Sequence, residues 1–145
     1  MTISYLIVNR MKSVCIYTIN IQKINYNKSE KEALELEKEV SKFNVNSLVV
    51  KCDISNEEEI KYMVNTIIDK YGKIDVLVNN AAISIDSLYQ DKNVINFKKT
   101  LDVNVIGTFL VSKYVGDIMY ENKYGKIVNL TSTNGINTYF PMCLE

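Results

Sequence analysis

Polar side chains follow three short apolar runs of this chain, at the points where each run ends. Asp53 follows the first run, Ser132 follows the last, and the pair Asn79–Asn80 follows the run between them. Short amides of this kind can hydrogen-bond neighbouring backbone and a ligand at once. If the runs are parallel strands, their carboxyl ends lie at one edge of a sheet, where ligands bind in such folds. The pattern therefore predicts a ligand site at that edge.

Each of these residues also has a purely structural explanation. Asp53 is a residue type that begins helices, Ser132 is common in turns, and asparagine-containing turns often follow strands. Asn104 is different, because it lies at helical spacing among apolar residues such as Leu101 and Val105. A buried amide must find hydrogen-bond partners, so Asn104 is either a structural bridge or part of a site.

Composition bounds the class of protein. The chain has 145 residues, 47% of them hydrophobic, which is enough for one folded domain spanning 1–145. Seventeen basic and seventeen acidic residues cancel, so charge gives no reason to expect a nucleic-acid partner. Three cysteines without a CxxC motif and the absence of histidine argue against a disulfide framework and a metal site. We expect a cytoplasmic protein with no membrane span and no metal.

Capping patterns mark the starts of two helices. Ser29 with Glu32, and Ser55 with Glu58, have the spacing of a capping box. Apolar residues at helical spacing follow each box, and Gly72 has the position of a helix-ending glycine. The sequence therefore predicts one helix that begins after Ser29 and a second that ends at Gly72.

A long helical region is predicted over residues 94–121, as one helix or as two abutting ones. Gly107 lies inside it. A glycine within a helix costs about 1 kcal/mol relative to alanine, unless close packing requires it. Residues 1–24 lack this helical pattern and are compatible with one or two strands.

After residue 24, helices and strands alternate along the chain. This alternation predicts an α/β fold with a doubly wound parallel sheet and helices on both faces. Such a fold places Asp53, Asn80 and Ser132 at one edge of the sheet, with no antiparallel strand between them.

Four segments in this order and spacing carry a family resemblance: CDIS (52–55), DVLVNNAA (75–82), DVNVIGTF (102–109) and GKIVNLTSTNG (125–135). Together they resemble the short-chain dehydrogenase/reductase family, and within it the 3-oxoacyl-(acyl-carrier-protein) reductases. The segment INYNKSEKEALEL (24–36) is similar to the second strand and following helix of those enzymes. The resemblance covers residues 23–145 and leaves 1–22 as an atypical N-terminal segment. It implies a single, incomplete Rossmann-like domain.

The resemblance implies a set of cofactor-binding residues. Asp53 would hydrogen-bond the adenine amino group, with Ile54 beside the ring. Asn80 and Ala81 would lie against the cofactor ribose, and Asn79 would stabilise the central strand.

It also implies cofactor choice and catalytic roles. Tyr26, Asn27 and Lys28 follow the second strand, where these enzymes choose between cofactors. Lys28 could meet a 2′-phosphate, which favours NADP over NAD. Ser132 would orient the substrate carbonyl, and Asn104 would hold the helix and a water of the proton relay.

Three family features are missing from this sequence. The glycine-rich turn after the first strand lets backbone N–H groups approach the cofactor pyrophosphate, but the first glycine here is Gly72. The glycine of the family's NNAG motif is replaced by Ala82. Hydride transfer to a ketone also needs a proton donor. The family uses a tyrosine with a lysine four residues later, and none of the ten tyrosines here has a lysine at that spacing. We expect a chain truncated before its catalytic tyrosine and altered at its N-terminus.

Two hypotheses follow. In the first, the chain is part of an NAD(P)-dependent ketoreductase and is inactive alone. The complete enzyme would act on a 3-oxoacyl thioester or a similar small-molecule or acyl-carrier-linked carbonyl, as in fatty acid biosynthesis. In the second, it is a non-catalytic remnant that forms homo-oligomers through residues 94–121. A third possibility, a response-regulator-like domain, lacks the acidic cluster that binds Mg²⁺ at the strand ends.

Overall fold

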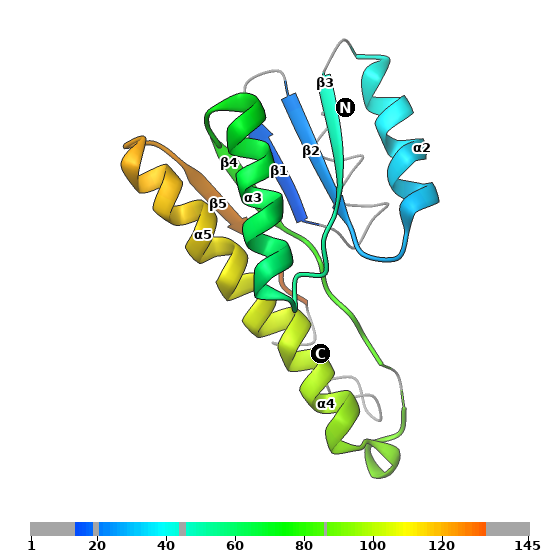
Figure 1. Ribbon diagram of the computed structural model, residues 1–145. Helices are drawn as coiled ribbons and strands as arrows, with labels where there is room; N and C mark the ends of the chain where they lie inside the picture. Colours follow the sequence, from blue (N-terminus) through cyan, green and yellow to red (C-terminus); the bar gives the residue numbers. More distant parts are fainter. Residues whose placement is uncertain (1–13, 19–20, 44–45, 86, 133–145) are drawn as a thin grey trace.

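The computed structural model describes residues 14–18, 21–43, 46–85 and 87–132, which form one five-stranded sheet with helices against it (Figure 1). The strands are β1 (Val14–Thr18), β2 (Ile21–Tyr26), β3 (Asn46–Lys51), β4 (Val76–Asn79) and β5 (Lys126–Asn129). Their order across the sheet is β3-β2-β1-β4-β5. The rest of the atypical N-terminal segment lies outside the described residues.

The predicted parallel arrangement is confirmed for four of the five strands. β2 pairs with β3, and β4 with β5, in parallel register. β1 is the exception, because it pairs antiparallel with both of its neighbours. Since β1 runs opposite to both β2 and β4, those two strands point the same way. The expectation of no antiparallel strand between Asp53 and Asn80 was therefore wrong, although β2, β3, β4 and β5 all end at the same edge.

Two helices follow β2 and β3, and their caps differ from the predicted ones. α2 (Glu30–Ser41) begins after Ser29 as predicted, but the serine side chain makes no capping hydrogen bond. α3 (Glu57–Tyr71) is capped by Asn56, one residue later than the predicted Ser55. The Asn56 side chain accepts hydrogen bonds from the amides of Glu58 and Glu59, and thereby satisfies two N–H groups at the helix start.

The end of α3 agrees with the prediction. Gly72 has a φ of 74°, in the left-handed region that favours glycine, and its amide donates to the carbonyl of Ile68 at 2.7 Å. The short connection from Gly72 then leads into β4.

The predicted long helical region consists of three consecutive parts. α4 (Val94–Leu101) continues into a π-helical segment, η2 (Asp102–Gly107), and then into α5 (Thr108–Glu121). A short 3-10 turn, η1 (Tyr89–Asp91), precedes them. Gly107 is required by close packing, because a Cβ atom there would lie 2.8 Å from the Ile54 carbonyl oxygen. π-helical segments inside α-helices occur frequently at functional sites.

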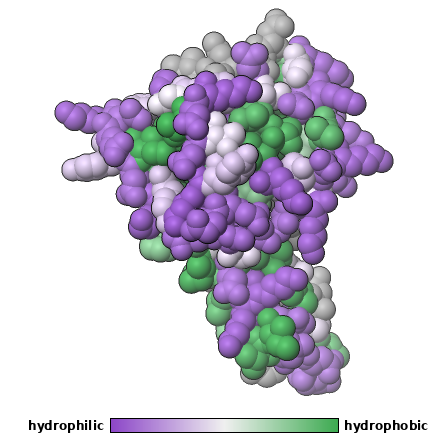
Figure 2. All heavy atoms as spheres, viewed as in Figure 1, coloured by the Kyte–Doolittle hydropathy of each residue, from purple (hydrophilic) through white to green (hydrophobic). Residues whose placement is uncertain are grey.

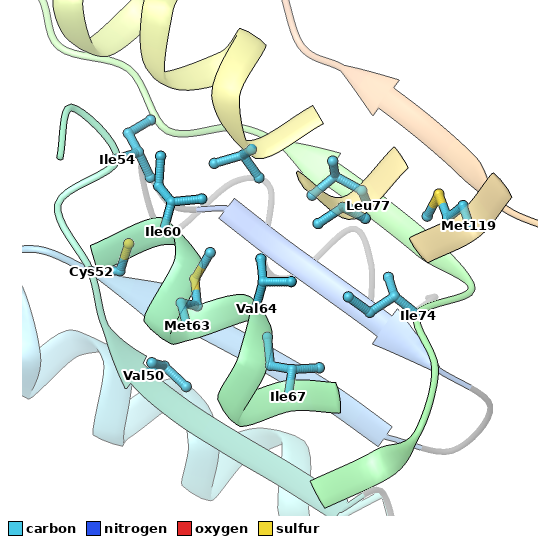
Figure 3. Close-up of a cluster of buried hydrophobic side chains, with 12 residues drawn as sticks. Val50, Cys52, Ile54, Ile60, Met63, Val64, Ile67, Ile74, Leu77 and Met119 are labelled. Atoms are coloured by element: carbon cyan, nitrogen blue, oxygen red, sulfur yellow. The ribbon is translucent and has the colours of Figure 1, made fainter. Parts of the chain in front are cut away.

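Helices cover both faces of the sheet, and each face has its own hydrophobic core. α3 and α5 pack on one face, where Ile60, Ile67 and Val111 belong to the same buried cluster as Leu77 of β4 (Figure 3). α2 packs on the other face, where Leu36 lies with Val78 of β4. Leu77 and Val78 thus point to opposite sides, as successive residues of a strand do.

Some apolar surface remains uncovered. α4 lies beyond the ends of the strands in Figure 1, and apolar side chains appear on this part of the molecule in Figure 2. We call this surface the apolar strip; its members are between 39% and 78% exposed and comprise Val94, Ile95, Phe97, Leu101, Val105, Ile106 and Phe109. All four residues of the edge strand β5 are also exposed. No helix within the described residues is long and apolar enough to cross a membrane.

Candidate functional site

The edge at which β2, β3, β4 and β5 end carries two adjoining grooves. We call this edge the rim. The larger groove has a volume of about 750 Å³ and the smaller one about 490 Å³. Ala82, Ile83 and Ser84, in the loop after β4, line both. Because the two grooves share this loop, an extended ligand could span both.

Asp53 lies in the larger groove, just past the end of β3. Its carboxylate oxygen Oδ1 accepts hydrogen bonds from the Ser55 hydroxyl at 2.6 Å and from the Ser55 amide at 3.0 Å. Burial alone would raise the pKa of Asp53, but the bonds from Ser55 lower it below its ordinary value. A side-chain hydrogen bond from Asn27 and the charge of Lys28 act in the same direction. Asp53 is therefore ionised at neutral pH and can accept hydrogen bonds.

Lys28 lines the larger groove together with Asp53, as does Asn27 of the same turn after β2. The structure thus brings the segment of predicted cofactor choice to the same groove as the predicted adenine partner. Ile54 differs, because its side chain is only 4% exposed, packs in the core and does not line either groove.

The smaller groove contains the other predicted site residues. Asn79, Asn80 and Ala81 line it from the end of β4, and Ser132 lines it from the segment after β5. Asn104 of η2 closes it from the helical side. All twelve lining residues are uncharged, so this groove presents amides, hydroxyls and apolar groups.

Asn104 uses both polar atoms of its side-chain amide on the backbone of a single residue, Ile83. Its Oδ1 accepts from the Ile83 amide at 2.8 Å, and its Nδ2 donates to the Ile83 carbonyl at 3.0 Å. The side chain therefore connects η2 to the loop shared by both grooves. Asn104 thus forms the structural bridge that was one of its two explanations. This bridge lies in the wall of the smaller groove.

Asn79 belongs to a polar network that its sequence motif did not predict in full. Its Nδ2 donates to the Ser112 hydroxyl of α5 at 2.9 Å and to Asn129 Oδ1 of β5 at 2.8 Å. Asn79 and Asn129 are register partners in the sheet. Sequence reasoning missed Ser112 and Asn129; the available signal was an asparagine at the end of each of two neighbouring strands.

Asn25 is a third residue that sequence reasoning missed. This buried side chain of β2 donates to the Cys52 carbonyl at 2.8 Å, next to Asp53. The Asp53 amide donates in turn to Glu59 of α3 at 2.8 Å. These two bonds fix the backbone that carries the Asp53 carboxylate. The described residues contain no group of three His, Cys, Asp or Glu placed to hold a metal ion.

Proteins with related sequences and folds are known. A family model described as short chain dehydrogenase matches residues 15–144. A 3-oxoacyl-[acyl-carrier-protein] reductase of Synechocystis sp. is 33% identical over 113 residues, which are 78% of this chain and 46% of the relative. The chain therefore spans about half the length of this curated relative.

Solved structures agree in fold. A short-chain type dehydrogenase/reductase from Mycobacterium marinum superimposes with a TM-score of 0.77 at 22% identity, over 83% of this chain and 49% of that one. A short chain dehydrogenase from Burkholderia cenocepacia, in complex with NADP, gives a TM-score of 0.74 at 21% identity, over 83% and 48%. The family match over residues 15–144, with this fold, shows that the chain belongs to the short-chain dehydrogenase/reductase family.

Proposed function

We propose that this chain provides the nucleotide-binding half of a cytoplasmic NAD(P)-dependent reductase, and that it does not reduce a carbonyl by itself. The observation that carries this proposal is the pair of adjoining grooves, which bring Asp53 and Ser132 to one rim through the shared residues 82–84. A dinucleotide has two nucleoside ends that need two such neighbouring sites.

The residues of the larger groove suit an adenine nucleoside. The ionised Asp53 carboxylate would accept a hydrogen bond from the amino group of the ring, and Asn27 and Lys28 would lie at the ribose end. The charge of Lys28 favours a 2′-phosphate and hence NADP.

The residues of the smaller groove suit the reacting end. Asn80 and Ala81 would contact the second ribose, with Asn79 holding the strand beneath them. The Ser132 hydroxyl would donate to the carbonyl oxygen of the substrate, and Asn104 would fix the wall of the site. When bound, NADPH would supply the hydride.

The proton for the developing alkoxide has no evident source in this chain. No tyrosine in the sequence is followed by a lysine four residues later, so the arrangement that would lower a tyrosine pKa is missing. Inactivity of this chain alone is therefore the expected result. By similarity to the Synechocystis reductase, the substrate class of the complete enzyme would be a 3-oxoacyl thioester or a similar carbonyl.

The central part of a dinucleotide fits these residues less well. In the family fold, a glycine-rich turn after the first strand presents backbone N–H groups to the pyrophosphate. Here the strand in the middle of the sheet, β1, is antiparallel and ends at the opposite edge. The described residues offer the nucleoside ends a place but give the diphosphate no such turn.

A purified 145-residue chain tests the proposal. We expect NADPH to bind, as a change in its fluorescence, and we expect no oxidation of NADPH when a 3-oxoacyl thioester is added. The Asp53→Asn variant should weaken binding, whereas Asp69→Asn, on the exposed surface of α3, should not. Turnover would contradict the predicted inactivity, and failure of the chain to bind any nucleotide would contradict the nucleotide-binding function.

The apolar strip supports a second candidate function, an interaction domain that forms homo-oligomers through residues 94–121. The strip contains seven large apolar side chains that are each at least 39% exposed, and large exposed apolar patches mark interaction sites. Size-exclusion chromatography with light scattering would show an oligomer in this case. Phe109→Glu should shift it toward the monomer, and Tyr62→Glu, at an exposed position of α3, serves as control.

A further inference from the structure

We infer that the rim binds the nucleoside parts of its ligand and leaves the diphosphate in solvent, so that adenosine binds as well as ADP. The identity of the base rests on the proposed function. Three observations on the described residues carry the inference: the direction of β1, the acidic starts of the rim helices, and the charge of the two grooves.

The direction of β1 removes the usual phosphate site from the middle of the sheet. Val14, the first residue of β1, pairs with Asn79 at the rim, whereas Tyr17 pairs with Val76 toward the opposite edge. Only two residues separate β1 from β2, so no helix lies between these strands. A helix N-terminus aimed at the middle of the rim, which commonly binds a diphosphate, is therefore absent between β1 and β2.

The helices that do begin at the rim carry acidic residues in their first turns. α2 begins with Glu30 and Glu32, and α3 begins with three glutamates, Glu57–Glu59. The Asn56 side chain already accepts hydrogen bonds from two amides of α3. Carboxylates near helix N-termini complement the positive end of the helix dipole themselves. A phosphate at α3 would meet carboxylates and N–H groups that are already capped, and a phosphate at α2 would meet the carboxylates of Glu30 and Glu32.

The net charge of the two grooves does not favour a diphosphate either. Two lysines line the larger groove, Lys28 and Lys99, against the carboxylates of Glu32, Asp53 and Asp102. The smaller groove has no charged lining residue. The two grooves together have a formal charge of −1. A diphosphate brought to this rim would be repelled on balance, whereas a neutral nucleoside would not.

Titration calorimetry of the whole 145-residue chain with adenosine and ADP tests the inference. We expect the two dissociation constants to agree within about threefold. Raising NaCl from about 20 to about 200 mM should leave ADP binding unchanged or strengthen it, because salt screens the repulsion. A phosphate cradle predicts the opposite result: ADP at least about thirtyfold tighter than adenosine, with the advantage lost in salt.

Variants separate this inference from the proposed function. Asp53→Asn should weaken adenosine binding about tenfold, and Asp69→Asn should leave it unchanged. If ADP binds much more tightly than adenosine, the inference is wrong while nucleotide binding stands. If neither ligand binds to a chain that is folded by circular dichroism, both the inference and the proposed function are wrong.

Discussion

Asn104 and Ile83 form a closed pair of hydrogen bonds, in which one side-chain amide pairs with both the backbone N–H and the backbone C=O of the same residue at 2.8 and 3.0 Å. Asn104 lies in the π-helical segment and Ile83 in the loop that lines both grooves. The helical region and the rim therefore cannot move independently without breaking two hydrogen bonds. Asn104 therefore influences the site by holding in place the loop that lines both grooves.

Replacing Asn104 with alanine should destabilise the fold by about 1–3 kcal/mol, because the backbone N–H and C=O groups of Ile83 both lose their partner. Urea unfolding measures this change. The matched control, Asn65→Ala on the exposed face of α3, should stay within about 0.5 kcal/mol. Equal stabilities of the two variants would mean that the pair with Ile83 contributes nothing.

Gly107→Ala and Gly116→Ala should change stability in opposite directions. A Cβ at Gly107 would lie 2.8 Å from the Ile54 carbonyl oxygen, so η2 must move and the cost should be about 1–3 kcal/mol. A Cβ at Gly116, inside α5, meets no atom within 4 Å. That substitution should gain up to about 1 kcal/mol from helix propensity. Thermal unfolding of both variants checks the pair; stabilisation by both would show that η2 is not packed on Ile54.

Lys23 should make the stability of the fold depend on pH above neutrality. This side chain of β2 is 2% exposed and lies 4.7 Å from the centre of the Tyr71 ring. Burial lowers its pKa from 10.5 to about 8, with the charge of Asp75 opposing the shift and that of Lys73 adding to it.

The folded state therefore releases this proton more easily than the unfolded state does. Between pH 8 and 10.5 the unfolded chain holds more protons, so stability contributed by Lys23 rises with pH across this window, by at most about 3 kcal/mol. Lys23→Met should flatten that rise in urea unfolding measured at several pH values. Lys70→Met, an exposed lysine near the same ring, should leave it intact. A stability that falls in wild type relative to Lys23→Met over this window would contradict the assignment.

Cys52 should be unreactive in the folded chain. Burial, followed by the charges of Glu59 and Asp53, raises the pKa of its thiol to about 12. The reactive thiolate is then rare at neutral pH. Iodoacetamide labelling followed by mass spectrometry should modify Cys52 at least about a hundredfold more slowly in buffer than in urea. Rapid labelling of the native chain would show that the end of β3 is open.

Local signals in the sequence predicted much of the fold. Gly72 was expected to end a helix, and it does. Gly107 was expected to weaken its helix unless close packing required it, and the structure shows that close packing. The alternation of elements predicted four parallel strands because each connection between them contains a helix long enough to return the chain. These are properties of residues close together in the sequence.

The features that sequence reasoning missed depend on contacts between distant residues. The antiparallel direction of β1 follows from its two-residue connection to β2 and its pairing with β4, more than fifty residues later. Asn129 and Ser112 acquire their roles only when β5 and α5 lie against Asn79. The cap of α3 shifted by one residue because Asn56 competes with Ser55, whose hydroxyl bonds to Asp53 instead.

The central claim is that Asp53, Asn80 and Ser132 belong to one nucleotide site at the rim. The most direct measurement is an NMR titration of the ¹⁵N-labelled chain with adenosine and NADP⁺, followed through the backbone amide signals. We predict that shifted signals gather at Lys28, Asp53 and Ile83 with adenosine, and extend to Asn80 and Ser132 with NADP⁺. Shifts confined to the apolar strip, or none at saturating ligand, would contradict the claim.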